Sequence, residues 1–349
     1  MQKLGKTYIL DNPVIVLSAA GVAGKKEGEG PLAQDFDVVF EDTAMGQDSY
    51  ELAESAMLKQ AIQLAISKSG VQEQDIDFIL AGDLLDQCTG SCFAVMDFGI
   101  PFLGMYGACS TMALTMCNAS LLLSAGANLC VVGASSHFAS SERQFRFPLE
   151  YGGQRTPTAQ WTVTGAGSMV LKNSGNADLS EEHGAVKICA VHIGTITDLG
   201  ITDANNMGAA MAPAAARTIS EVLHDTNTTP DDYDLILTGD LGFTGTQLLY
   251  ELLEREYGIN ICPVHKDCGL MIYDLEGQDV NSGGSGCGCS ASVLCSHIIK
   301  NMKNGSLKKV LFVATGALMS PTSTKQGRTI PGIADSVAHI YPLCCRFFR

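Results

Sequence analysis

Apolar residues recur at intervals of three and four in two long stretches of the chain, residues 50–69 and 207–224, which predicts two core-facing helices. Short apolar and β-branched runs precede and follow these helices. They lie at residues 14–17, 129–133, 186–196 and 310–314. When strands alternate with helices, each crossover places a helix on a sheet face and the strands run parallel. The pattern therefore predicts an α/β protein with parallel sheets covered by helices.

An internal repeat extends this pattern. The segment DFILAGDL at residues 77–84 returns as DLILTGDL at residues 234–241. Each copy is followed by a turn of small residues, at 107–111 and 284–290, and then by an apolar helix and a strand. The order β-α-β-α-β therefore occurs twice. We expect two halves, residues 1–178 and 179–349, that are related by an approximate twofold axis and pack their helices together.

One uncharged stretch needs a separate explanation. Residues 98–141 contain no Asp, Glu, Lys or Arg, which is long enough to cross a bilayer. Glycine, proline and asparagine interrupt this stretch repeatedly, so we expect a buried helix and a buried strand instead. Residues 1–11 carry no apolar signal segment. The sequence therefore predicts neither a transmembrane helix nor a signal peptide.

Charge and cysteine content narrow the function classes. The 349 residues include 22 Lys and Arg against 37 Asp and Glu, a net charge of −15, which argues against nucleic acid as a partner and against electrostatic docking on anionic lipid. The 13 cysteines form no Cys-x-x-Cys pair, so we expect reduced thiols and no metal site. No glycine-rich segment has the spacing of a nucleotide-binding loop, and no cofactor is expected.

The turn Gly107-Ala108-Cys109-Ser110-Thr111 opens the apolar helix of the first half. It stands where thiolases and ketoacyl synthases carry their nucleophilic cysteine. With the duplicated element order, this motif makes the chain resemble a thiolase-like protein. The resemblance implies two pseudo-twofold-related βαβαβ halves in a layered α-β-α-β-α core.

Several long segments without periodicity lie outside the repeat. They are KEGEGPL at 26–32, ERQFR at 142–146, TAQWTVTGAG at 158–167, NMGAAMAPAAA at 206–216 and GGSGC at 283–287. These segments resemble the signatures of the stage V sporulation protein AD family. The resemblance implies that the chain binds dipicolinic acid (pyridine-2,6-dicarboxylate) for uptake into the developing endospore. It also implies a peripheral place at the forespore or spore inner membrane, with other SpoVA membrane proteins as partners. The last ten residues, 340–349, do not resemble the family, and we expect them to form an atypical tail.

Cys109 is the candidate nucleophile. The free N–H groups and the positive dipole end of a helix start favour thiolate and lower a thiol's pKa. A condensing enzyme also needs groups that hold the oxyanion. By resemblance to the ketoacyl synthases, Asp240 stands where a catalytic His is expected, and Cys287 where Asn or His is expected. Because a carboxylate cannot stabilise an oxyanion, we expect a binding protein. An active acyltransferase that uses Cys109 is the alternative, and a scaffold with a vestigial pocket is a third interpretation.

The two carboxylates of dipicolinate call for arginine, hydroxyl or amide donors. Arg143 and Arg146 lie in an unusually polar loop and are the candidate ligand-binding cations. Surface pairs with Glu142 and Glu150 are the alternative for both arginines.

Three more residues are candidate ligand contacts because they follow predicted strands. His137 comes after the strand at 129–133, at the strand end where α/β folds place ligands. Asp83 and Asp240 end the two repeated strands, and they would suit Ca²⁺ if the ligand were bound as its calcium chelate. For the two aspartates, ordinary turn or capping carboxylates are the alternative.

We also expect a homodimer. The resemblance implies it, because thiolase-type folds pair through the strand near the cysteine turn. The uncharged stretch at 98–141 also carries more apolar surface than one half needs.

Overall fold

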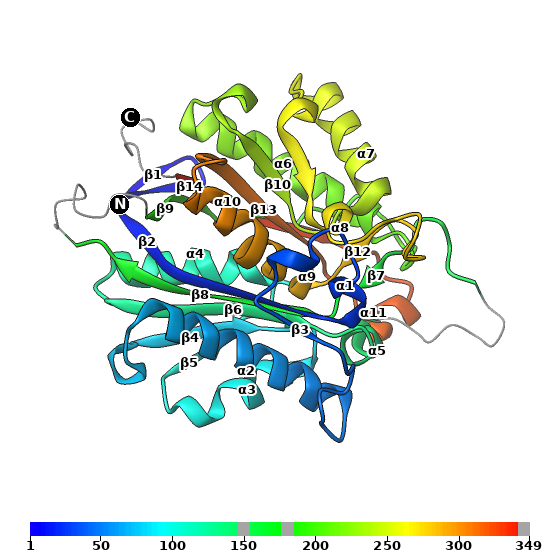
Figure 1. The fold of residues 1–349 in the computed structure, drawn as a ribbon. Coiled ribbons are helices and arrows are strands. Elements are labelled where there is room, and N and C mark those ends of the chain that lie inside the picture. Colours follow the sequence, from blue (N-terminus) through cyan, green and yellow to red (C-terminus); the bar gives the residue numbers. More distant parts are fainter. Residues whose placement is uncertain (146–153, 176–184, 341–349) are drawn as a thin grey trace.

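A computed structural model describes residues 1–145, 154–175 and 185–340 (Figure 1). The first half contains a long strand, an outer helix, two short parallel strands with a short helix between them, a central helix and two more long strands. In chain order these are β2 (Thr7–Gly24), α2 (Tyr50–Ser69), β4 (Phe78–Gly82), α3 (Thr89–Val95), β5 (Phe102–Gly104), α4 (Thr111–Ser124), β6 (Leu129–Ser136) and β8 (Gly165–Asn173).

The second half repeats this order. Its elements are β9 (Val186–His192), α6 (Met207–Thr226), β10 (Leu235–Thr238), α7 (Gly242–Leu252), β11 (His265–Asp267), α9 (Cys287–Val293), α10 (Ile299–Lys303), β13 (Lys309–Ala317) and β14 (Gly332–Ile340). The shorter elements are β1 (Gln2–Leu4), α1 (Lys25–Gly28), β3 (Val38–Phe40), α5 (Ser140–Phe145), β7 (Trp161–Thr162), α8 (Cys268–Met271), β12 (Gly284–Ser285) and α11 (Pro321–Lys325).

The strand order is the same in both halves. It runs β5-β4-β6-β8-β2 in the first and β11-β10-β13-β14-β9 in the second, so each reads third, second, fourth, fifth, first. The expectation of parallel sheets is only partly met, because the fifth strand of each half, β8 or β14, runs antiparallel to its neighbours. Among the described residues, only the short helices α5 and α11 lie before these strands, and a connection without a long crossover helix allows the next strand to return antiparallel. The sheets are therefore mixed.

The two halves join where their first strands meet. β2 pairs antiparallel with β9 through Thr7 and His192, Tyr8 and Val191, and Ile9 and Ala190. We call this pairing the seam. The expected boundary between residues 178 and 179 lies outside the described residues, and the division at that point stays a prediction.

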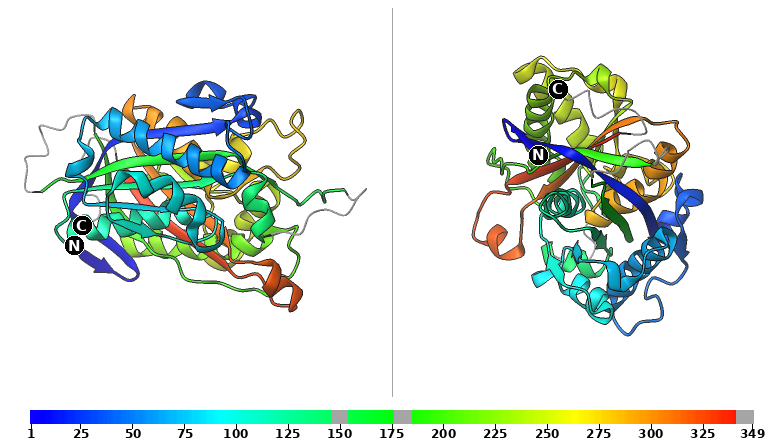
Figure 2. Two further views of the ribbon diagram at one scale, coloured as in Figure 1. Left: turned by 90° about the horizontal axis from the view of Figure 1, so that it is seen from below. Right: turned by 90° about the vertical axis from the view of Figure 1, so that its left-hand side faces the viewer.

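Helices form the outer and central layers. α2 packs on β8, β6 and β2, whereas α6 packs on β14 and β13, and Figure 2 shows these outer helices on opposite sides of the molecule. α4 and α9 are the central helices, because α4 of the first half contacts both its own β6 and β14 of the second half, whereas α9 of the second half packs on β8 and β6 of the first half. The layers therefore follow the expected α-β-α-β-α order.

Local signals explain where the outer helices begin and end. The Ser49 hydroxyl accepts the Leu52 N–H at the start of α2, and Gly70 ends that helix in the left-handed region at φ +74°. Asn206 caps α6 by accepting the Ala209 N–H. The predicted helix at 50–69 is thus confirmed residue for residue, and the one predicted at 207–224 continues to Thr226.

The uncharged stretch forms the buried helix α4 and strand β6, as predicted. Among the described residues, no helix has both the length and the apolar character needed to span a membrane.

Candidate functional site

The cysteine turn, Gly107 to Ser110, leads into the central helix α4. Ala108 adopts a positive φ of +50°, and the Ser110 N–H closes the turn on the Gly107 carbonyl at 3.0 Å. The end of β13 presses against this turn, because a Cβ at Gly316 would lie 2.5 Å from the Gly107 carbonyl oxygen. Cys109 is 6% exposed as a result.

Asp240 lies beside Cys109 at the end of the second repeated strand. One carboxyl oxygen accepts the Gly286 N–H at 2.8 Å and the other accepts the Thr315 hydroxyl at 2.9 Å. The Cys109 thiol is a third hydrogen-bond partner. Burial raises the pKa of Asp240 to about 7, and these hydrogen bonds oppose the shift only in part.

The Cys109 thiol is not activated by its place at a helix start. Burial raises its pKa well above the ordinary value, and the charges of Asp240 and Cys287 raise it further. The expected lowering by the helix dipole is therefore overridden, because desolvation and a neighbouring carboxylate both disfavour a thiolate. Cys109 carries a protonated thiol at neutral pH.

Cys287 opens the other central helix, α9, at the position that corresponds to the cysteine turn. Its thiol donates to the Ser135 carbonyl at 2.9 Å. Burial raises the pKa of Cys287, and Glu54, Asp83 and Asp240 add to this effect. The structure thus brings Cys109, Asp240 and Cys287 together.

Asp83 ends β4 and serves the turn into α3. Its carboxylate accepts the Leu85 N–H at 2.8 Å and both the N–H and the hydroxyl of Ser91 at 2.6 Å. This is the turn-carboxylate role that was the alternative to calcium binding. Within the described part of the chain, no group of three or more His, Cys, Asp and Glu side chains is placed to hold a metal ion.

Glu54 is a buried carboxyl that sequence reasoning missed. It projects from α2 and accepts hydrogen bonds from the hydroxyls of Ser135, Ser140 and Ser141. Burial raises its pKa to about 8, and the charge of Asp83 contributes. The available signal was an acidic residue directly after Ala53 on the apolar, core-facing side of a helix.

A small cavity opens beside Cys109. Its lining is mainly apolar and comprises Leu84, Tyr106, Ala108, Cys109, Phe145, Met207, Ala317 and Met319. The cavity has room for about 10 Å³, which is space for one water molecule. An aromatic ligand can enter only if side chains at this cavity move.

The candidates His137 and Arg143 are not among the residues that line this cavity. His137 is buried, its Nε2 donates to the Thr43 carbonyl at 2.8 Å and its Nδ1 accepts the Ala139 N–H at 3.2 Å. It therefore has the contacts of a structural histidine. Burial lowers its pKa. Arg143 is 56% exposed and pairs with Glu51. Arg146 lies outside the described residues, as does Glu150.

Two solved structures illustrate how widely this architecture is shared. The 3-oxoacyl-[acyl-carrier-protein] synthase III of Aquifex aeolicus VF5 gives a TM-score of 0.57 at 12% identity and covers 94% of this chain and 100% of that one. The cerulenin-bound OleA of Xanthomonas campestris gives 0.60 at 13% identity, with 98% and 100% covered. At such identities the likeness establishes the fold alone. The chain is thus a thiolase-like α/β protein, as predicted.

Sequence comparison narrows this class. The profile of the stage V sporulation protein AD (SpoVAD) family matches residues 5–340. The stage V sporulation protein AD of Bacillus subtilis (strain 168) is 45% identical over 339 residues, which are 97% of each chain. The chain therefore belongs to the stage V sporulation protein AD family, which confirms the predicted family.

Proposed function

We propose that this chain binds dipicolinate during sporulation and passes it to membrane partners of the SpoVA assembly. Membership of the stage V sporulation protein AD family supports the sporulation role. The resemblance of its sequence segments to that family implies the ligand and the partners. A peripheral place at the forespore or spore inner membrane is part of the same proposal.

The contact between Asp240 and Cys109 is the observation that favours binding over catalysis. An acyl-transferring site needs a thiolate and donors for the oxyanion. Here the thiol donates to a carboxyl group, and the pKa values of Cys109 and Asp240 are both raised by burial. As a carboxylate, Asp240 disfavours negative charge both on the Cys109 sulfur and on a substrate oxygen. Acyl transfer needs negative charge at both of these places.

The cavity beside Cys109 is the proposed ligand site. Leu84, Phe145 and Met319 supply apolar walls for an aromatic ring. Their side chains must move to admit the ligand, since the cavity holds only about one water molecule. Methionine adapts to such changes easily because its side chain is unbranched and flexible.

The buried carboxyl groups near the cavity affect whether a dicarboxylate can bind in it. The carboxyls of Glu54, Asp83 and Asp240 all act electrostatically on Cys287, and Asp240 also contacts Cys109 in the cysteine turn. As carboxylates they repel a dicarboxylate, whereas a protonated carboxyl can donate a hydrogen bond to one. Arg143 stands on α5 with the cavity residue Phe145, and it would have to leave Glu51 to reach the ligand. We propose that dipicolinate enters together with protons on the buried acids.

We also propose that two copies pair along β5. This strand is an edge of the described sheet, next to β4 (Figure 1). Large apolar side chains are exposed on and around it, namely Phe93, Met96, Leu103 and Tyr106. An edge strand with an exposed apolar border is a typical surface for strand pairing between subunits.

Calorimetry with dipicolinate tests the proposed ligand. The parent protein is expected to bind it, and Cys109→Trp is expected to lose binding because the indole would fill the cavity. Leu199→Trp, on the exposed loop between β9 and α6, is the matched control and is expected to bind like the parent. Absence of heat from the parent, with a normal unfolding transition, would remove the proposal.

A further inference from the structure

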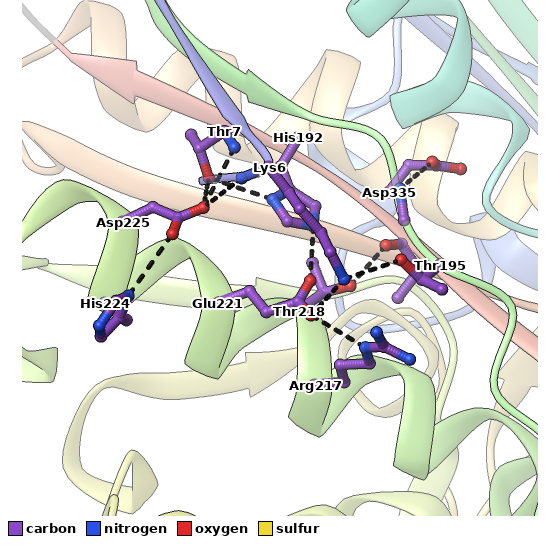
Figure 3. Close-up of polar contacts among 12 residues, drawn as sticks. Lys6, Thr7, His192, Thr195, Arg217, Thr218, Glu221, His224, Asp225 and Asp335 are labelled. Carbon is purple, nitrogen blue, oxygen red and sulfur yellow. Dashed lines mark hydrogen bonds and ion pairs between the residues drawn. The ribbon is translucent and has the colours of Figure 1, made fainter. Parts of the chain in front are cut away.

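A dense polar network lies at the seam between the two halves, away from the cysteine cavity. Figure 3 shows His192 of β9 between Thr7 of β2 and Glu221 of α6. His192 is 1% exposed. Its Nδ1 lies 3.1 Å from the Thr7 hydroxyl, and its Nε2 lies 3.3 Å from a carboxylate oxygen of Glu221.

The hydrogen bonds of Thr7 bear on the tautomer of His192. The Thr7 hydroxyl lies 3.0 Å from Asp225, which also accepts the N–H groups of Lys6 and Thr7. When the hydroxyl gives its only proton to Asp225, it can only accept from His192, and Nδ1 then carries a proton in both charge states. In the neutral imidazole, Nε2 then presents a lone pair to Glu221.

Glu221 remains an anion in this network. Burial opposes its ionisation, but hydrogen bonds from Lys6 at 2.7 Å and Arg217 at 2.9 Å outweigh burial and lower its pKa. Both donors bind the same carboxylate oxygen. The other oxygen faces His192 Nε2, and these two buried atoms have no hydrogen-bond partner. With a neutral imidazole, two acceptors are held face to face.

We propose that His192 and Glu221 form a proton-operated latch across the seam. It is open when the imidazole is neutral, and an Nε2–H···Oε2 hydrogen bond closes it when the imidazole is protonated. Closure joins the first strand of the second half to α6 while Nδ1 still binds the first half through Thr7.

The charged and titratable groups around His192 set the pH at which the latch works. Burial lowers the pKa of His192, Glu221 and Asp225 on α6 oppose this effect, and Lys6 before β2 supports it. The remaining groups on neighbouring elements are Arg217 and His224 on α6, Asp335 on β14 and Cys117 on α4, whose thiol lies 3.8 Å from the His192 carbonyl. Closure therefore occurs on acidification below the ordinary histidine pKa of about 6.5.

The latch is connected to the cysteine turn. Gly194, two residues beyond His192, donates its N–H to Asp335 at 2.8 Å. The other oxygen of Asp335 accepts the Ser110 hydroxyl at 2.7 Å, directly after Cys109. Asp335 is buried, so a shift of the β9 end on closure is transmitted to Ser110.

Nitrogen NMR of the full chain with ¹⁵N-labelled histidine tests the latch directly. Between about pH 5 and pH 8 the neutral form of His192 is expected to be the uncommon Nδ1–H tautomer, with protonation at Nε2 below pH 6.5. His192→Gln assigns the signal. The Ser110 amide is expected to shift with the same midpoint in the parent and to lose that shift in His192→Gln. His265 is an internal control, because burial lowers its pKa to about 4 and it should remain neutral.

Glu221→Gln tests the role of the carboxylate. The amide donates to the Nε2 lone pair and removes the attracting charge, so the His192 midpoint should fall by about one pH unit or more. Glu73→Gln, on a loop of the first half, should leave the midpoint unchanged. An Nε2–H tautomer for neutral His192, an unmoved midpoint in Glu221→Gln, or a Ser110 shift that persists in His192→Gln would each overturn the proposal.

Discussion

At the residue scale, Asp240 holds hydrogen bonds from Gly286 and Thr315 while its burial raises its pKa to about 7. A carboxyl whose pKa is raised on folding binds more protons in the folded chain than in the unfolded one. The free energy of unfolding therefore falls as the pH rises from the unfolded value of about 3.9 towards 7. Asp240 contributes stability that is present in acid and is lost at neutral pH.

Asp240→Asn should reduce this dependence on pH. Between about pH 5.5 and pH 7 the parent is expected to lose roughly 1–2 kcal/mol more unfolding free energy than the variant, because only the parent releases this proton. Urea unfolding at both pH values measures the difference. Asp97→Asn, an exposed ion-pair partner of Lys59, is the control and should keep the slope of the parent. Equal slopes in the parent and Asp240→Asn would show that Asp240 is ionised throughout.

Sequence reasoning found some site residues and missed others for physical reasons. Cys109, Asp240 and Cys287 could be assigned to one site because the resemblance to ketoacyl synthases places them at the positions of that family's catalytic groups. Glu54 was missed because an acidic residue on a helix is normally solvated, and only the three serines that surround it make its burial tolerable. The Glu51 partner of Arg143 lies on a helix far away in the sequence, which no local pattern reveals.

At the element scale, the central helix α9 rests directly on the backbone of the sheet. A Cβ at Gly167 of β8 would overlap the carbonyl oxygen of Ala291, and a Cβ at Gly288 would overlap the carbonyl oxygen of Gly165. Such close approach is possible only where both surfaces lack side chains. These glycines keep α9, and with it Cys287, at the level of the cysteine turn.

Gly167→Ala should destabilise this contact. The added methyl group must push α9 away from β8, and overpacking of this kind costs about 1–3 kcal/mol of unfolding free energy. Chemical denaturation of the parent and the variant measures the loss. Gly104→Ala is the matched control, because the nearest atoms to its new methyl group are side-chain carbons at an ordinary 3.5 Å. A Gly167→Ala variant as stable as the control would show that α9 can move freely.

Helix positions were the most predictable part of the fold, and strand direction was the least. α2 and α6 can be predicted from the periodicity of their apolar residues and from the capping residues Ser49 and Asn206. The antiparallel course of β8 depends on the connection that follows β6, in whose described residues α5 is too short to cross the sheet. Hydrophobic runs mark a buried strand, but they carry no information about its direction.

At the scale of the whole molecule, the proposed dimer depends on the apolar border of β5. Leu103→Arg should place a charge in the pairing surface and convert a dimer to a monomer of 36.8 kDa, as measured by sedimentation at micromolar concentration. Leu199→Arg is the control, since Leu199 is also exposed but lies on the loop between β9 and α6. A parent protein that sediments as a monomer would contradict the dimer, as would a Leu103→Arg variant that remains dimeric.

The central claim is that the fold of a condensing enzyme has been kept for binding while its chemistry has been lost. Dipicolinate calorimetry on the parent and Cys109→Ser, with intact-protein mass measured after incubation with an acyl-CoA thioester, tests this claim most directly. A serine hydroxyl can replace the thiol as a donor to Asp240, so both proteins should bind dipicolinate and neither should gain an acyl group. A mass increase of one acyl group on the parent that is absent from Cys109→Ser would contradict the account, because it would show that Cys109 is a working nucleophile.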